Sequence, residues 1–292
     1  MHRDFLIYGT LNQKLGQKLH TQVSITQNDV DVYNNLGYLV VHNAFTANRI
    51  QSLLAAVDRL IDRALAGDCE IGWIDKDSRL PARVGHLLHS DKYDHAYADW
   101  LGEDLAPHIE RLLGNEPVRH SLFGMLASGG GQPYCQSWHR DLCKPGEDGE
   151  EASLLRHHGN FLQFNAPLLP ADRFLNIVPA SHLRASTVQE LKVAEKDASL
   201  SMPEAIELKL EPGDIVYYNA NLWHRGWNPN GDKRWTMHCA FWKAGCPVMK
   251  HEFGQRETLL KHVDEMPAVA SQYVQNYIDN YPESDPKSFL EL

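Results

Sequence analysis

Hydrophobic residues recur at helical spacing in the first third of the chain. In TANRIQSLLAAVDRLIDRALAG, residues 46–67, seven aliphatic side chains lie three or four positions apart, between a Thr46 cap and a Gly67 stop. Because polar residues occupy the opposite face, we expect the apolar face to pack against a sheet. Further helices are expected over residues 26–37, over about 96–113 with a break at Pro107, and from about residue 255 onward.

The middle of the chain changes to short segments rich in β-branched and aromatic residues. Gly, Pro, Asn or Asp separates these segments, as is typical of strands joined by turns. The expected strands are GYLVVH (37–42), VRHSLFGMLAS (118–128), YCQSWHRD (134–141), NFLQFNAPLL (160–169), FLNIVPAS (174–181), IELKL (206–210), DIVYYN (214–219) and RWTMHCAFW (234–242). Many short strands in series predict an antiparallel sandwich or barrel. Residues 147–159 interrupt them, and we expect a long loop that serves as a lid.

The sequence has no internal repeat, low-complexity tract or linker-like stretch. We therefore expect one domain over residues 1–292, mainly β with flanking helices. Its expected parts are a mostly helical support and substrate-side segment (24–115), a β-barrel core (116–245) and a C-terminal helical extension (255–292).

Composition and charge exclude several classes of protein. Hydrophobic residues make up 43% and charged residues 23% of the chain, which is ordinary for a globular protein. A formal net charge of −10 repels phosphate backbones, so nucleic acid is not an expected partner. No apolar run approaches the roughly 18 residues of a membrane helix. The five cysteines are odd in number and form no C-x-x-C pair, which favours reduced thiols and a cytoplasmic location.

The stretch HRDLCKPGE, residues 139–147, resembles both a protein-kinase catalytic loop and part of an iron site. The kinase loop H-R-D-L-x-x-x-N requires an asparagine at the position of Gly146. The chain also has no G-x-G-x-x-G, V-A-I-K, D-F-G or A-P-E motif. We therefore reject the kinase interpretation.

An H-x-D pair on a strand can bind one metal ion, because residues two apart point to the same face. The sequence contains four such pairs: His2–Asp4, His89–Asp91, His139–Asp141 and His262–Asp264. The first lies near the terminus, the second in a loop-like segment, and the last in a helical pattern. Only His139–Asp141 ends an expected strand.

A third ligand is expected downstream in EPGDIVYYNANLWHRGWNPNGDKRWTMHCAFW. His224 follows the strand after the P-G-D turn, and Arg234 lies ten residues later. We expect a hairpin to bring Arg234 near the interior that His224 faces. Two histidines and one carboxylate form the facial triad of non-haem Fe(II) oxygenases, and a buried arginine fork is the natural partner of a carboxylate.

The order and spacing of these motifs resemble the phytanoyl-CoA dioxygenase (PhyH) family of Fe(II)/2-oxoglutarate-dependent oxygenases. VDVYNNLGYLVVHNAFTANRI resembles the opening of the family, and LNIVPASHLRA resembles its P-G-S-H segment, with Ala180 in place of the glycine. The resemblance runs from about residue 24 to residue 243.

This resemblance implies a double-stranded β-helix, a jelly-roll barrel with the site at its open end. It implies that His139, Asp141 and His224 bind Fe(II) and that Arg234 binds the distal carboxylate of 2-oxoglutarate. Gln163 and Asn165 would face this cosubstrate, and O₂ would be the oxidant. Many members carry Ser or Thr two residues after the distal histidine, where this chain has Gly226.

The expected reaction is hydroxylation of a C–H bond, with release of succinate and CO₂. The presence of Asp141 disfavours halogenation, whereas desaturation, ring closure and epimerisation share the first steps. Basic or polar residues near the expected mouth favour a small polar or anionic substrate: Trp73, Arg83, His86, His89, Arg140, Lys144, Arg156, His157 and His158. The alternatives are a cupin-like metalloenzyme that does not use 2-oxoglutarate and a non-catalytic jelly-roll binding protein. The sequence gives no indication of the oligomeric state.

Overall fold

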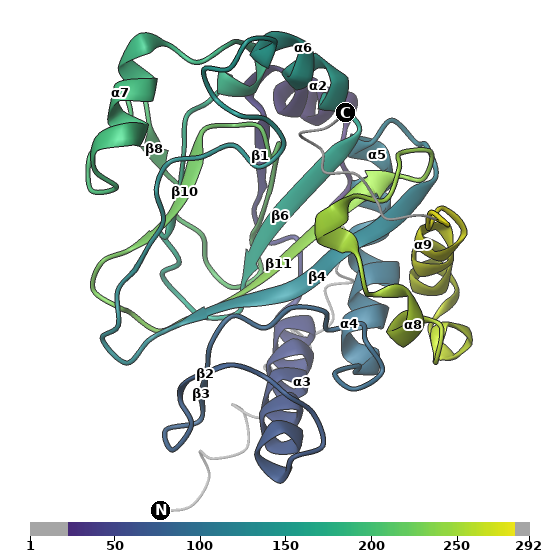
Figure 1. Cartoon of the computed structure of the whole chain (residues 1–292). Coiled ribbons are helices and arrows are strands. Elements are labelled where there is room, and N and C mark those ends of the chain that lie inside the picture. Colours follow the sequence, from purple (N-terminus) through teal and green to yellow (C-terminus); the bar gives the residue numbers. More distant parts are fainter. Residues whose placement is uncertain (1–22, 284–292) are drawn as a thin grey trace, which may run out of the picture.

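Two antiparallel sheets form the centre of the computed structural model, which describes residues 23–283 (Figure 1). The larger sheet has the order β1 (Tyr38–Val41), β9 (Ile215–Tyr218), β6 (Phe161–Pro167), β11 (Arg234–Lys243) and β4 (Val118–Ser128). The smaller sheet has the order β5 (Tyr134–Cys135), β10 (His224–Asn228), β7 (Leu175–Ile177) and β8 (Ile206–Glu207). Strands β2 (Trp73–Asp75) and β3 (Leu80–Pro81) pair separately. The predicted double-stranded β-helix is confirmed, with antiparallel sheets that do not close.

The inner strands β6 and β9 of the larger sheet are buried on both faces, for two different reasons. In β6, Leu162 and Phe164 belong to the main hydrophobic core, where helices pack against the sheet. Gln163 and Asn165 point the other way and line a cavity between the two sheets. This alternation follows from the two-residue period of a strand. One face of the sheet therefore stabilises the fold, and the other carries polar side chains.

Most of the described helices lie on one side of the larger sheet, whereas the two that follow β5 and β7 lie elsewhere (Figure 1). The bounds of these helices are α2 (Gln27–Leu36), α3 (Ala47–Ala66), α4 (His95–Trp100), the π-helical η1 (Leu101–Leu105), α5 (Ala106–Leu112), α6 (Glu150–His157), α7 (Val188–Lys196), α8 (Arg256–Leu259) and α9 (Ala268–Asp279). The predicted Thr46 cap and Gly67 stop of α3 are both present. Among the described helices, none has the length and apolar character needed to cross a membrane.

Pro107 does not break the helix in which it lies. It lies in the first turn of α5, but the helical backbone is continuous from α4, so the N–H that proline lacks leaves one backbone hydrogen bond unmade. The preceding turn, η1, widens to π-helical geometry, so that the chain runs from α4 into α5 without a loop.

Two predictions about local structure are wrong. Residues 147–159 are not a loop throughout, because α6 forms within them. Its acidic first turn and basic last turn suit the helix dipole. Strands β10 and β11 do not form a hairpin, because they belong to different sheets. The turn between them is held by the Asn228 side chain, which bonds the backbone N–H and the carbonyl of Asp232.

A buried ion pair joins the C-terminal segment to β4. Arg119 donates to both carboxylate oxygens of Glu252, at 2.8 and 3.0 Å, and both side chains are fully buried. Arg119 also donates to the carbonyl oxygens of Cys246 and Pro247, and Glu252 accepts from the Met249 N–H. The fork thus fixes the path of the chain after β11.

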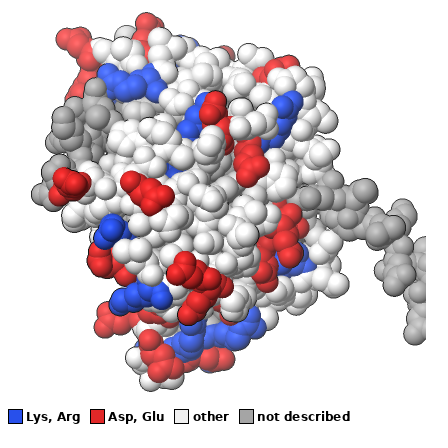
Figure 2. All heavy atoms as spheres, turned by 90° about the vertical axis from the view of Figure 1, so that its right-hand side faces the viewer, with Lys and Arg blue, Asp and Glu red and all other residues white. Residues whose placement is uncertain are grey.

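Charged side chains on the face that carries α8 and α9 are mixed in sign. Figure 2 shows Lys and Arg dispersed among Asp and Glu there, rather than gathered in one basic patch. This mixture is consistent with the formal net charge of −10. The exclusion of nucleic acid stays a prediction.

Replacing Glu252 with glutamine should destabilise the fold by about 3 kcal/mol, because it leaves the Arg119 charge buried without its counter-ion. Chemical denaturation measures the free energy of unfolding. The matched control is E257Q, which removes an exposed partner of Arg256 and should cost under about 1 kcal/mol. Equal losses in the two variants would contradict a structural role for the buried pair.

Candidate functional site

His139 and His224 lie directly opposite one another on neighbouring segments. Each backbone N–H donates to the carbonyl oxygen of the other residue, at 3.0 Å in both directions. The expected strand 134–141 is shorter than predicted, since β5 ends at Cys135. The isolated bridge nevertheless holds His139 in register with the start of β10. The Asp141 N–H donates to the Ala220 carbonyl oxygen at 2.9 Å and extends this pairing.

Both imidazoles are oriented by backbone carbonyl groups. His139 Nδ1 lies 2.7 Å from the Ser137 carbonyl oxygen, and His224 Nδ1 lies 2.9 Å from that of Leu222. Because a carbonyl only accepts, each Nδ1 carries a proton, which leaves each Nε2 as the atom that can bind a metal once it is deprotonated. Such bonds fix the tautomer of metal-binding histidines. In the metal-free protein, burial lowers the pKa of His224, but the Asp141 carboxylate beside Nε2 outweighs this and raises the pKa above its ordinary value.

The Asp141 carboxylate lies between the two Nε2 atoms. Its Oδ1 is 3.5 Å from His139 Nε2, and its Oδ2 is 3.4 Å from His224 Nε2. Gln163 Nε2 donates to Oδ2 at 3.0 Å. Burial alone would raise the pKa of Asp141, but the two imidazoles and the amide hold that pKa well below its ordinary value. The carboxylate is therefore ionised.

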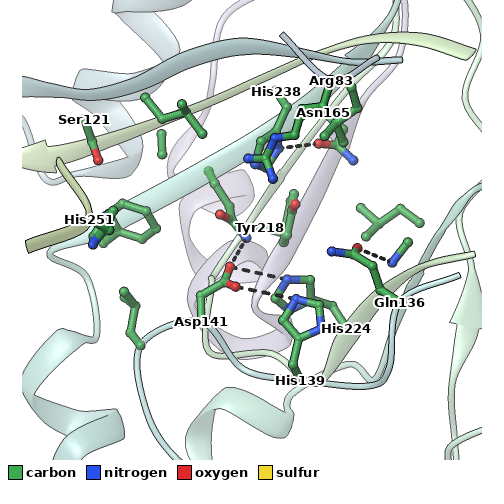
Figure 3. A pocket seen from close by; sticks show the side chains of 18 of the residues that line it. Arg83, Ser121, Gln136, His139, Asp141, Asn165, Tyr218, His224, His238 and His251 are labelled. Carbon is green, nitrogen blue, oxygen red and sulfur yellow. Dashed lines mark hydrogen bonds and ion pairs between the residues drawn. The ribbon is translucent and has the colours of Figure 1, made fainter. Parts of the chain in front are cut away.

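These three side chains fit a divalent iron ion. Their ligating atoms all lie within 4.8 Å of one another, and among the described residues no other group of His, Cys, Asp and Glu meets this condition. Two neutral imidazoles and one carboxylate are the donors expected for non-haem Fe(II). Figure 3 shows the three side chains converging at one end of the cavity.

The cavity has a volume of about 280 Å³ and is lined from both sheets. All six predicted site residues line it, together with other polar residues. The polar lining residues are Arg83, Ser121, Tyr134, Gln136, His139, Asp141, Gln163, Asn165, Tyr218, His224, Arg234, His238 and His251. Asn165 Oδ1 accepts from His238 Nδ1 at 2.8 Å. Burial lowers the pKa of His238 to about 3, so this imidazole is neutral.

Arg234 is buried at the start of β11 and retains an unused donor. Its Nε lies 3.1 Å from Asp172 Oδ2 and 3.0 Å from Thr236 Oγ1, and Thr236 Oγ1 also donates to Asp172. These contacts fix the plane of the guanidinium group. Its Nη2 is buried and has no partner among the described residues. A carboxylate oxygen reaching this atom would satisfy it.

Arg83 enters the cavity from a segment that precedes the barrel. Val84 exchanges two backbone hydrogen bonds with Met125 of β4, at 3.0 and 2.8 Å. Gly124 permits this approach, because a Cβ there would lie 2.7 Å from the Val84 carbonyl oxygen. The guanidinium group of Arg83 lies beside His238 (Figure 3). It has no hydrogen bond or ion pair with another described residue.

The other basic residues predicted near the mouth lie elsewhere. Arg140 is buried and donates to the carbonyl oxygens of Ser181 and Asn221, away from the cavity. His86 and His89 contact the Gln255 side chain. The remaining predicted residues, Trp73, Lys144, Arg156, His157 and His158, are not among those that line the cavity. His2–Asp4 lies outside the described residues.

Several residues of the site were missed by sequence reasoning. His238 is separated from Arg234 by two strand periods, so the alternation of β11 could have placed it on the same face. No comparable sequence pattern indicated that Asp172 and Gln136 belong to the site. Their roles depend on contacts with Arg234 and Gly226, far away along the chain.

Comparisons with known proteins agree with this architecture. A family model, phytanoyl-CoA dioxygenase (PhyH), matches residues 33–234. No curated protein sequence matches the chain.

Similar solved structures share the fold at low sequence identity. AviO1 from Streptomyces viridochromogenes Tue57 has a TM-score of 0.55 and 20% identity, over 77% of this chain and 98% of that one. EctD from S. alaskensis, solved with 2-oxoglutarate and 5-hydroxyectoine, has a TM-score of 0.58 and 17% identity, over 82% and 83% of the two chains. The carbocyclase SnoK from nogalamycin biosynthesis, a non-heme alpha ketoglutarate dependent enzyme, has a TM-score of 0.52 and 17% identity, over 75% and 84%.

The family assignment rests on the matched residues, which make up more than half of the chain. The fold of the solved structures and the converging His-Asp-His group agree with it. The chain belongs to the phytanoyl-CoA dioxygenase (PhyH) family and is an oxygenase of the Fe(II)/2-oxoglutarate-dependent kind.

Proposed function

We propose that this protein hydroxylates a C–H bond of a small polar or anionic metabolite and releases succinate and CO₂. The observation that carries the proposal is one cavity that contains both the converging His-Asp-His group and the unpartnered Nη2 of Arg234. The first suits Fe(II), and the second suits a carboxylate of 2-oxoglutarate. The proposal treats residues 1–292 as one domain, with the parts 24–115, 116–245 and 255–292.

His139, Asp141 and His224 would hold the iron. When bound, Fe(II) supplies the activation of O₂ that couples oxidation of 2-oxoglutarate to oxidation of the substrate. The carbonyl groups of Ser137 and Leu222 keep the two Nε2 lone pairs directed at the metal. Gln163 holds the carboxylate of Asp141 on the same side.

Arg234 would bind the distal carboxylate of 2-oxoglutarate. Asp172 and Thr236 orient the guanidinium group before the cosubstrate arrives, so little side-chain entropy is lost on binding. Gln163 and Asn165 also face this space. In the structure, however, the amide nitrogen of Gln163 donates to Asp141, and the amide oxygen of Asn165 accepts from His238.

The position of Arg83 supports the proposal that the substrate is polar or anionic. It brings a positive charge to the cavity from outside the barrel, and no described carboxylate neutralises it. The neutral His238 beside it offers hydrogen bonding without a further charge. A substrate with a carboxylate or phosphonate group would pair with the guanidinium fork.

Hydroxylation is the outcome that we propose, because it completes the reaction with no further rearrangement of the substrate. Among the solved relatives, SnoK is a carbocyclase and SnoN an epimerase. Product analysis by mass spectrometry separates these outcomes, since hydroxylation alone adds one oxygen atom. The five unpaired cysteines support a reducing, cytoplasmic location, which stays a prediction.

Replacing His139 with alanine should weaken Fe(II) binding at least roughly tenfold and abolish succinate formation, because only two protein ligands remain. Anaerobically purified protein is loaded with Fe(II) and 2-oxoglutarate, O₂ is admitted, and succinate is quantified together with bound iron. H95A, at an exposed position at the start of α4, is the control and should match the parent. Succinate formation unaffected by H139A would contradict the assignment.

Replacing Arg234 with lysine should raise the KM for 2-oxoglutarate by roughly tenfold or more, because lysine keeps the charge beside Asp172 but loses the planar fork. R173K, at the exposed position next to Asp172, is the matched control. Steady-state succinate release at varied 2-oxoglutarate gives both constants. Unchanged activity in R234K would favour a cupin-like metalloenzyme that does not use 2-oxoglutarate.

Replacing Arg83 with glutamine should raise the KM for an anionic substrate by roughly tenfold, while the affinity for 2-oxoglutarate stays unchanged. Amino acids, organic acids and phosphonates are first screened for stimulation of succinate release by the parent. The hits are then compared between R83Q and R156Q, whose substitution lies outside the cavity. The same KM in the parent and in R83Q would contradict the proposal that the substrate is an anion bound by Arg83.

A further inference from the structure

Gly226 leaves a gap in the wall of the cavity that another side chain fills. It lies two residues after His224 in β10 and shares its face. A Cβ at this position would lie 2.7 Å from Gln136 Oε1 and 2.8 Å from Tyr134 Cε1. The backbone of Gly226 does not have a positive φ angle. The backbone conformation would therefore admit a side chain here, but such a side chain would displace the Gln136 carboxamide and the Tyr134 ring from their positions.

The carboxamide of Gln136 has a fixed orientation. The Gly226 N–H donates to Gln136 Oε1 at 3.0 Å. Because an N–H group can only donate, this contact assigns the oxygen to the wall and turns Nε2 inward. Figure 3 shows this nitrogen directed into the cavity, toward His224. It has no hydrogen-bond partner among the described residues.

The side-chain bond is not needed to hold the two segments together. The Gln136 N–H already donates to the Gly226 carbonyl oxygen at 2.9 Å, and β5 pairs with β10 at Trp227 and Asn228. The side-chain hydrogen bond therefore fixes the orientation of the Gln136 carboxamide and is not needed for the register between β5 and β10. Its effect is to present a neutral donor beside the converging His-Asp-His group.

We propose that Gln136 Nε2 donates a hydrogen bond to a carboxylate oxygen of bound 2-oxoglutarate, and that Gly226 lacks a side chain to make room for this contact. The inference rests on the proposed function. Gln136 and Arg234 both line the cavity with the predicted iron ligands. Arg234 Nη2 is a buried donor without a partner among the described residues, and Gln136 Nε2 is a half-buried donor whose oxygen is already paired. A dicarboxylate offers acceptors to both, and a charge-assisted hydrogen bond is stronger than a neutral one.

Equilibrium binding of 2-oxoglutarate tests the proposal without any turnover. Anaerobic, Fe(II)-loaded protein is titrated with 2-oxoglutarate by calorimetry, using the parent, Q136A and Q136E. Q136A removes the donor and should weaken binding by about tenfold. Q136E keeps an oxygen for the Gly226 N–H but places a negative charge where the donor was, so it should weaken binding further than Q136A.

Two controls separate a ligand contact from a structural role. Q189E makes the same chemical change at an exposed position in α7 and should bind 2-oxoglutarate like the parent. The double variant Q136A/G226S places a serine hydroxyl in the space vacated by the glutamine, with the Tyr134 ring turned aside, and should recover at least threefold in affinity over Q136A. Melting temperatures should be the same in all variants, and no variant should lose affinity for Fe(II).

The outcomes distinguish the inference from the function on which it rests. If the parent binds 2-oxoglutarate and Q136A and Q136E bind it within twofold, Gln136 is not a ligand contact and the inference is overturned. If the variants lose affinity only in proportion to lowered melting temperature, the role is structural and the inference is likewise overturned. If the parent binds Fe(II) but not 2-oxoglutarate, the proposed function itself fails.

Discussion

The site depends on one pair of backbone hydrogen bonds, those that His139 and His224 exchange across the gap between two segments. Side-chain hydrogen bonds can orient an imidazole, but only this bridge brings the two rings to 4.3 Å between centroids. Asp141 follows on the same segment, and its own N–H continues the pairing. Residues 139–141 make no further strand, so the order of this short segment derives from β10. Any change in the path of β10 would move all three predicted ligands.

The two faces of the larger sheet have different roles: the outer face packs in the hydrophobic core, and the inner face carries the residues of the candidate site. Its outer face packs aromatic and aliphatic side chains against helices, where Phe164 and Phe241 are fully buried. Its inner face presents amides, imidazoles and a guanidinium group, which are also shielded from water but are paired with one another. Buried polar groups are costly when unsatisfied. The few donors left unpaired on this face, Arg234 Nη2 among them, thus indicate where a ligand belongs.

Sequence patterns predicted the features that depend on local signals. Helix α3 has its expected cap and stop, and the strands of the larger sheet lie where the apolar periodicity placed them. The spacing of His139, Asp141 and His224 predicted that these three side chains converge, and the structure brings them together. Their binding of iron stays a prediction. The partners of Arg234 and of Gly226 were not predictable, because each lies in a distant segment. Periodicity also cannot assign consecutive strands to different sheets, which is why β10 and β11 were expected to form a hairpin.

The segment that carries Arg83 also covers the free edge of β4, through the two bonds between Val84 and Met125. An uncovered edge strand can pair with another copy of the chain and seed aggregation. The proposed role of Arg83 in substrate binding and the protection of this edge therefore depend on the same short stretch of backbone. A substitution at position 83 leaves the two backbone bonds of Val84 in place, but an insertion or deletion that shifts Val84 would expose the edge. Diversification of specificity along this segment is thus confined to substitutions that keep its register.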